Sequence, residues 1–296
     1  MAAGSMNLVG RAGAGPREAA AWSRRQVLLT DLRSVRGRAY PRVRGLTREP
    51  SWLLFEILLP FLGTSAFVFV YRALEAPQEY VGFVVLGGAL TAFWLNVIWM
   101  MANQLYWEKA QGNLELYFAA PMHFMSILFG MAVGGMAMST TRAATVLVIA
   151  GTLYGVTFTV DQWLLLVGVF VLTLGALYGL GMVLASLFLV WGREAWHMGQ
   201  LLTEPVYFVS GLNFPVARLG MLGALSVAFL PLATGLDAMR QLAFADAAFP
   251  AGTPPPLVEV AILVVMTVVS IVAARAMLIA MERRARRDGR LSVRWQ

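Results

Sequence analysis

Five polar side chains stand inside long apolar segments: Glu56, Asn96, Asn103, Arg142 and Glu204. A charge within a segment that lipid surrounds is costly, so it generally pairs with another group or marks a functional pathway. We therefore expect Arg142 to have a partner, for which Glu56 and Glu204 are the available acids, or to contact water. The amides of Asn96 and Asn103 either line a polar pathway or bond neighbouring helices.

The chain lacks the residues for nucleotide hydrolysis and for a metal site. Its single lysine is Lys109, followed by Ala110, whereas a phosphate-binding loop requires Gly-Lys-Ser/Thr. The only histidines are His123 and His197, and there is no cysteine, so no zinc-ligand pattern is present. We expect this chain to bind no metal or cofactor and to catalyse no reaction by itself.

One short motif leaves an enzymatic alternative open. Residues 63–66 read Gly-Thr-Ser-Ala, in which Ser65 superficially resembles an intramembrane nucleophile. A serine hydrolase would also require His123 or His197 to reach Ser65, together with donors for an oxyanion. Because serine commonly forms hydrogen bonds within apolar helices, this is the weaker interpretation.

Composition indicates that lipid surrounds most of the folded surface. The 296 residues are 59% hydrophobic and 13% charged, with a mean hydropathy of +0.69, whereas a soluble domain is about 25% charged. The net charge of +7 is concentrated at the ends, because ten arginines precede Trp52 and six follow Met281. Basic tails around an apolar body favour contact with an anionic membrane surface and exclude a basic nucleic-acid-binding face.

The pattern of apolar runs predicts an all-α integral membrane protein. A transmembrane helix must cross ~30 Å of hydrocarbon. Six runs predict six transmembrane helices, of which the fifth is short: residues 52–71, 81–105, 124–154, 163–191, 197–212 and 257–281. Residues 213–256 are too apolar for a loop and are broken by proline and glycine, which predicts an extracellular re-entrant helical pair between the fifth and sixth spans.

The sequence before the first span predicts an amphipathic helix at the membrane surface, since apolar and arginine residues alternate there at helical spacing. We divide the chain into a disordered tail (1–16), this interfacial helix (17–48), a transmembrane domain (49–282) and a basic tail (283–296). Because both ends are basic, both termini are predicted to be cytoplasmic in a multi-pass protein of the cell (plasma or inner) membrane. Loop 106–123 is then also cytoplasmic.

Three pairs of glycines have the spacing that lets helices approach closely: Gly130 and Gly134, Gly151 and Gly155, and Gly175 and Gly179. Such pairs occur at dimer or pathway interfaces, but they more often serve packing within one chain. We favour packing within the chain for all three.

The predicted cytoplasmic loop carries acidic and aromatic residues around a glycine. The residues that stand out in it are Trp107, Glu108, Gly112, Leu114, Glu115 and Leu116. A short helix over 114–118, ended by Pro121, would present an apolar and acidic surface to a partner protein. A plain connector with interfacial aromatic anchors explains the same residues equally well.

Two segments resemble the ABC-2 type exporter permeases, which include drug-resistance and polysaccharide-export members. In the loop, Trp107-Glu108, Gly112-Asn113-Leu114-Glu115-Leu116 and Ala120-Pro121 look like the family pattern, although threonine is commoner at Asn113. The later segment carries Ser210-Gly211-Leu212-Asn213-Phe214-Pro215, then Leu230-Pro231-Leu232, then Asp237 and Arg240; a proline frequent near Leu219 in the family is missing.

This resemblance implies a permease that works as a dimer of two such chains and docks on ATP-binding subunits, which carry ATP and Mg²⁺. It implies coupling through the loop residues named above, and an external gate at Gly211, Phe214, Pro215, Pro231 and Arg240. A drug, antibiotic or other amphipathic molecule is the first expectation for the substrate. The alternatives are export of a polysaccharide or lipid-linked glycan, the serine hydrolase, and a membrane scaffold that transports nothing.

Overall fold

The computed structural model describes residues 24–48, 50–113, 116–117, 122–191, 195–250 and 252–287. These ranges are helical, apart from turns and an isolated bridge between Thr159 and Phe244. The helices are α1 (Arg24–Arg48), α2 (Pro50–Ala73), α3 (Gln78–Leu95), α4 (Gln104–Ala110), α6 (Phe124–Tyr154), α7 (Trp163–Trp191), α8 (Ala195–Val209), α9 (Met221–Phe229), α10 (Pro231–Ala243) and α11 (Pro256–Arg287). The 1–16 tail, most of the 283–296 tail, Leu114 and Glu115 lie outside the described residues.

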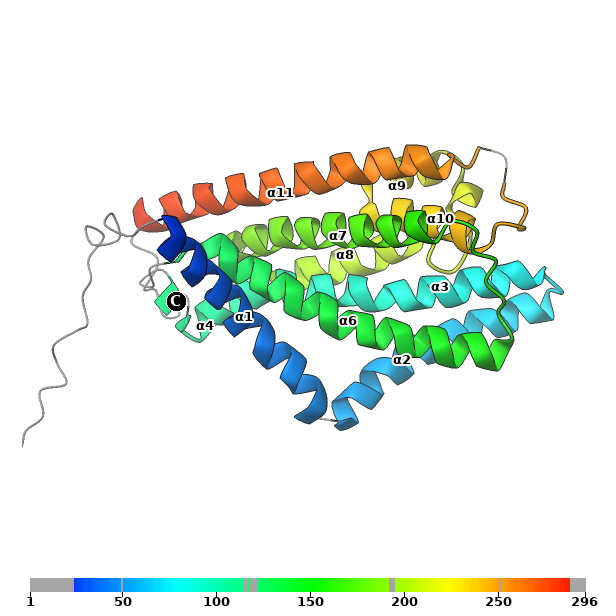
Figure 1. Cartoon of the computed structure of the whole chain (residues 1–296), viewed down its shortest axis with the longest axis horizontal. Helices are drawn as coiled ribbons and strands as arrows, with labels where there is room; N and C mark the ends of the chain where they lie inside the picture. Colours follow the sequence, from blue (N-terminus) through cyan, green and yellow to red (C-terminus); the bar gives the residue numbers. More distant parts are fainter. Residues whose placement is uncertain are drawn as a thin grey trace, which may run out of the picture.

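The helices form an elongated bundle with α3 at its centre (Figure 1). Every residue of α3 from Val81 to Trp94 is buried, as expected of a helix that is apolar on all sides. Helices α2, α6 and α10 pack around it, and α11 packs mainly on α7. Large apolar side chains are exposed along the outer surfaces of α2, α7 and α11, which suits a lipid-facing exterior.

Helix α1 meets α2 at an angle and crosses the bundle obliquely (Figure 1), packing against α6 over much of its length. The start of α1, the end of α11 and helix α4 all lie at one end of the bundle (Figure 1). Both ends of the described chain therefore lie on the same side, as an even number of crossings requires. Helix α11 also continues beyond the predicted boundary at residue 282, to Arg287.

All six predicted spans are helices, but they differ in length. Within the described part of the chain, four segments are long and apolar enough to cross a membrane: Gln78–Ala110, Phe124–Tyr154, Trp163–Phe188 and Pro256–Met281. The fifth predicted span is only the 15-residue α8, about 22 Å long at 1.5 Å per residue. In α2, the apolar stretch among the described side chains, Ile57–Ala73, is also shorter than these four. The structure thus supports four apolar crossings, or five if the bent pair described next counts as one.

The stretch predicted to be re-entrant contains two helices joined by a sharp bend. Helices α9 and α10 meet at Leu230 at an angle of 102°, in the half of the bundle away from the termini (Figure 1). Leu230 is extended and Pro231 is the first residue of α10, where its missing N–H removes no helical hydrogen bond. This bend is typical of a broken span or a re-entrant loop.

A π-helical segment, which the sequence pattern did not predict, interrupts the second span. It covers Asn96–Ala102 and joins α3 to α4. The side chain of Asn103 donates a hydrogen bond from Nδ2 to the carbonyl of Ile98 (2.9 Å). This bond satisfies a carbonyl in the wider turn and gives Asn103 a structural role within its own segment.

Candidate functional site

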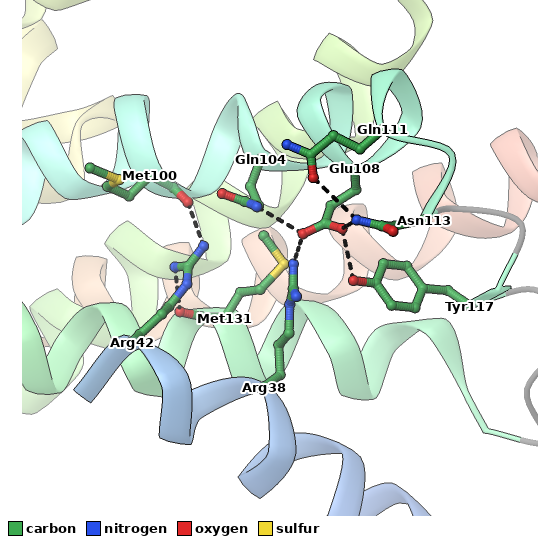
Figure 2. Close-up of polar contacts among 9 residues, drawn as sticks. All are labelled: Arg38, Arg42, Met100, Gln104, Glu108, Gln111, Asn113, Tyr117 and Met131. Atoms are coloured by element: carbon green, nitrogen blue, oxygen red, sulfur yellow. Dashed lines mark hydrogen bonds and ion pairs between the residues drawn. The ribbon is translucent and has the colours of Figure 1, made fainter. Parts of the chain in front are cut away.

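A buried carboxylate at the end of the bundle that carries α4 is the centre of a dense polar cluster. Glu108 in α4 is buried and accepts hydrogen bonds from four side chains (Figure 2). The donors are Gln104 Nε2 (2.8 Å), Asn113 Nδ2 (3.0 Å), Tyr117 Oη (2.8 Å) and the Arg38 guanidinium, which is also its ion-pair partner. A buried carboxylate requires such compensation, because burial removes its hydration.

Arg38 reaches this cluster from α1, 70 positions earlier in the chain. Its guanidinium also lies over the ring of Tyr117, 5.5 Å from the ring centre. One turn further along α1, Arg42 donates to the carbonyls of Met100 (2.8 Å) and Met131 (3.1 Å). Burial, with a smaller contribution from nearby Arg38, lowers the pKa of Arg42 to about 10, so it stays protonated at neutral pH.

A second contact joins α1 to the other end of the loop. Asp31 accepts from the backbone N–H of His123 (3.1 Å), and its other oxygen lies 2.8 Å from His123 Nδ1. Burial alone would raise the pKa of Asp31, but hydrogen bonds from His123 and Ser126 outweigh it and lower the pKa. Asp31 therefore caps the start of α6 as a carboxylate, where the helix dipole also favours negative charge.

Two glycines allow α1 to approach α6 closely. A Cβ on Gly130 would lie 2.8 Å from the carbonyl oxygen of Val35, and one on Gly134 would lie 3.1 Å from the Cα of Ala39. Gly175 and Gly179 likewise face Thr267 and Ser270 of α11, whereas an added Cβ on Gly155 would meet no atom within 4 Å. Packing within the chain, the favoured interpretation, is therefore confirmed for two of the three pairs.

The structure separates the predicted loop residues into inward and outward ones. Glu108 faces inward, whereas Trp107 is exposed and Leu116 is 67% exposed. Gly112 is exposed and has φ +76°, a turn conformation that glycine adopts without strain. Leu116 and Tyr117 have helical backbone, while the other residues of the predicted loop helix, 114, 115 and 118, lie outside the described residues.

Sequence reasoning missed Arg38, Arg42, Tyr117 and Asp31 as members of this site. Helix α1 carries arginines on all sides, so its pattern does not show which of them face inward. One signal was present: Gly130 and Gly134 mark a face of α6 that another helix contacts closely. The i, i+4 spacing of Arg38 and Arg42 fits one face of a helix placed there.

The predicted external-gate residues form a second site around Arg240. This buried guanidinium donates to the carbonyls of Gly211 (2.8 Å), Leu212 (2.9 Å), Phe214 (3.0 Å) and Phe83 (2.9 Å). Gly211 has φ +66°, and a Cβ on Gly87 would lie 1.7 Å from the Leu212 carbonyl. Arg240 thus fastens the turn after α8 against α3.

Other predicted gate residues lie near this site or apart from it. Pro215 is buried and caps the short 3₁₀ helix Val216–Leu219. Pro231 lies at the bend between α9 and α10. The structure therefore brings Gly211, Phe214 and Arg240 together, and places Pro231 two to three helical turns from Arg240 along α10.

The intramembrane polar residues do not gather into one site. Asn96 Oδ1 accepts from the Tyr178 hydroxyl (3.1 Å), so Asn96 bonds a neighbouring helix. Arg142 is buried in α6, whereas Glu204 is exposed on α8. The pairing of Arg142 with Glu204 stays a prediction, and the side chain of Glu56 lies outside the described residues.

The geometry gives no support to a Ser65 nucleophile paired with His123. The Ser65 hydroxyl donates to the carbonyl of Phe61 (2.7 Å), within α2. The His123 ring contacts Asp31 instead. The described residues also contain no group of three or more His, Cys, Asp or Glu side chains placed to hold a metal ion.

The long apolar helices, the bent pair and the polar loop cluster define a polytopic helical membrane protein. The model of the ABC-2 type transporter family matches residues 42–244, from the end of α1 to the end of α10. Since this is more than half of the chain, the protein belongs to the ABC-2 type transporter family, and it is a transport permease. No curated protein sequence matches it at a significant level.

Proposed function

We propose that this chain is the permease subunit of an ATP-driven exporter and that loop 106–121 docks on a separate ATP-binding subunit. The exported molecule is a drug, an antibiotic or another amphipathic compound. The ATP-binding subunit carries ATP and Mg²⁺, since this chain has no phosphate-binding loop. Two permease chains form the pathway, with their termini in the cytoplasm, six spans and a re-entrant α9–α10 pair.

The observation that carries the coupling proposal is the attachment of α1 to both ends of the loop. Arg38 binds Glu108 near the start of loop 106–121, and Asp31 binds the backbone of His123 just after its end. A displacement of the loop by a bound partner would therefore move α1 and α6 together. The exposed Trp107 and Leu116 remain available for a partner and suit an apolar docking contact.

Exposure of Glu204 supports the second permease chain. A carboxylate at the lipid-facing surface of a span is costly, and Glu204 is exposed on α8 beside the exposed Leu201 and Phe208. A second chain or a polar pathway between two chains would cover this face of α8. The basic ends of the chain support the cytoplasmic placement of the termini.

The docking surface is tested with Leu116→Arg in a mild-detergent pull-down of the chain from its native membranes. We expect a nucleotide-hydrolysing subunit to copurify with the wild-type chain and its recovery to fall at least about tenfold with Leu116→Arg, equivalent to ~1.4 kcal/mol. The physical reason is that a charge replaces an apolar contact at the centre of the interface.

Leu74→Arg is the matched control, because Leu74 is 69% exposed, like Leu116 at 67%, but follows α2 at the opposite end of the bundle (Figure 1). It should retain the ATPase. Equal recovery with both variants would contradict docking through the loop. Recovery of no ATPase with the wild-type chain would favour the scaffold that transports nothing.

A further inference from the structure

Two buried carboxyl groups face each other where the bent helix pair meets the last helix. Asp237 of α10 is 2% exposed and Glu259 of α11 is 0% exposed. The two side chains lie within hydrogen-bonding reach of each other. The Gln241 side chain donates to Glu259 Oε2 (3.0 Å), so one oxygen of Glu259 is satisfied.

One oxygen of each carboxyl group is left without a donor. Asp237 Oδ2 and Glu259 Oε1 are buried, and no donor from the described part of the chain reaches either. A buried acceptor without a donor is costly, and two facing carboxylates also repel each other. One proton held between the two groups removes both costs, because the protonated oxygen donates to the other carboxylate.

The balance of charges also indicates that the two carboxyl groups hold one proton. Arg240 lies one helical turn from Asp237 on α10, on the same side of that helix, and the two groups interact electrostatically. Two carboxylates and one guanidinium carry a net charge of −1, whereas one added proton makes the buried group neutral. The terminal N–H groups of Arg240 donate to four backbone carbonyls. Its buried Nε has no hydrogen-bond partner among the described residues, so no donor of Arg240 reaches the two open carboxylate oxygens.

The other helices that pack on α10 bring no further ionised group to this place. Tyr71 of α2 interacts with Arg240, and its hydroxyl donates to the Asn213 carbonyl (3.0 Å). Tyr80 of α3 accepts from Arg218 (3.4 Å), and Glu79 is exposed. Helices α7 and α9 contain no charged residue, and Tyr178 of α7 is bonded to Asn96.

We propose that Asp237 and Glu259 form a proton-binding site, in which one shared proton, balanced by Arg240, ties the bent α9–α10 pair to α11. This site is independent of the docking function proposed above. Loss of the proton would leave an unbalanced negative charge between α10 and α11. The contact between the bent pair and the last helix should then weaken as the pH rises.

The site is tested by thermal unfolding of the full chain in lipid nanodiscs, followed by tryptophan fluorescence. We expect the wild-type melting temperature to fall by at least about 3 °C between about pH 7 and pH 10, as the shared proton is lost. Asp237→Asn and Glu259→Gln each supply an amide donor and leave one carboxylate to balance Arg240. Both variants should therefore fold and lose this pH dependence.

Two further variants separate charge balance from general damage. The double variant Asp237→Asn with Glu259→Gln leaves Arg240 unbalanced and should melt below either single variant at every pH. Glu79→Gln removes an exposed acid at the same end of the bundle and should keep the wild-type pH dependence. If the single amide variants keep that dependence as well, the shared proton is excluded.

Infrared spectroscopy detects the protonated carboxyl group directly and does not depend on unfolding. At neutral pH the wild-type chain should show the carbonyl band of one protonated carboxyl, and either amide variant should lose it. Absence of the band in the wild-type chain would overturn the proposal. A melting temperature that depends on sodium or calcium at constant pH would also overturn it, in favour of a bound metal ion.

Discussion

At the scale of single residues, Glu108 shows how a loop position acquires its role from a distant side chain. Its spacing within the loop suggested a docking group, but its carboxylate faces inward and binds Arg38. With a buried carboxylate, removal of the cationic partner leaves a desolvated charge, which costs more than the loss of one surface ion pair. Arg38 and Glu108 are therefore positioning residues for the loop.

We expect Arg38→Met to lower the free energy of unfolding by about 2–3 kcal/mol, because Glu108 loses its ion-pair partner and one charged hydrogen bond. Thermal unfolding in detergent measures this loss. Arg36→Met changes an exposed arginine of the same helix and should stay within about 0.5 kcal/mol of wild type.

The pairing itself is separated from other effects by adding Glu108→Gln to Arg38→Met. The double variant should be less destabilised than the sum of the two single variants, since no unpaired charge is left. Additive losses would show that Arg38 and Glu108 act independently.

At the scale of helices, the contact between α1 and α6 depends on the absence of side chains at Gly130 and Gly134. A methyl group at Gly130 would lie 2.8 Å from the Val35 carbonyl and 2.9 Å from the Arg38 Cβ. The neighbouring backbone has to move to admit it. Helix α1 would then shift away from α6, and the contacts of Arg38 and Arg42 would be weakened.

Gly130→Ala should therefore destabilise the chain by about 1–3 kcal/mol through this clash and expose the arginines of α1 to trypsin. Limited proteolysis in detergent is the measurement. Gly168→Ala is the control, because no atom lies within 4 Å of its added Cβ, and alanine favours the helix by up to about 1 kcal/mol. Equal trypsin resistance of the Gly130→Ala and wild-type chains would contradict the close contact.

At the scale of the whole molecule, the fold places both ends of the described chain and the loop on one side of the bundle (Figure 1). The basic ends predict that this side faces the cytoplasm. The chain has no cysteine, so each introduced thiol reports a single position. Leu74, Gln111 and Arg283 are exposed and suit this purpose.

With a membrane-impermeant thiol reagent on intact cells, we expect labelling of Leu74→Cys only. Gln111→Cys and Arg283→Cys should react only after the cells are permeabilised, because their side of the bundle is predicted to be cytoplasmic. Labelling of Gln111→Cys and Arg283→Cys from opposite sides would exclude an even number of crossings between them and require a different topology.

The sequence by itself determined where the helices lie and what kind of protein this is. Apolar runs of sufficient length gave α7 its observed bounds, Trp163–Trp191, and α6 its bounds, Phe124–Tyr154. These features are local, because a helix satisfies its backbone within one segment and lipid favours an apolar one. The loop and Gly-Phe-Pro motifs are local as well, and they placed the chain in its family.

Only the tertiary structure decided which polar groups meet. Arg38 with Glu108, Arg240 with the carbonyls after α8, and Asp237 with Glu259 each join segments that the periodicity of either segment leaves unrelated. The length of α8 was also undecided, because Val206–Leu212 is apolar whether helical or turned, and the turn is held by Arg240 from α10. Burial makes such distant partners necessary, since a desolvated charge needs compensation wherever the fold places it.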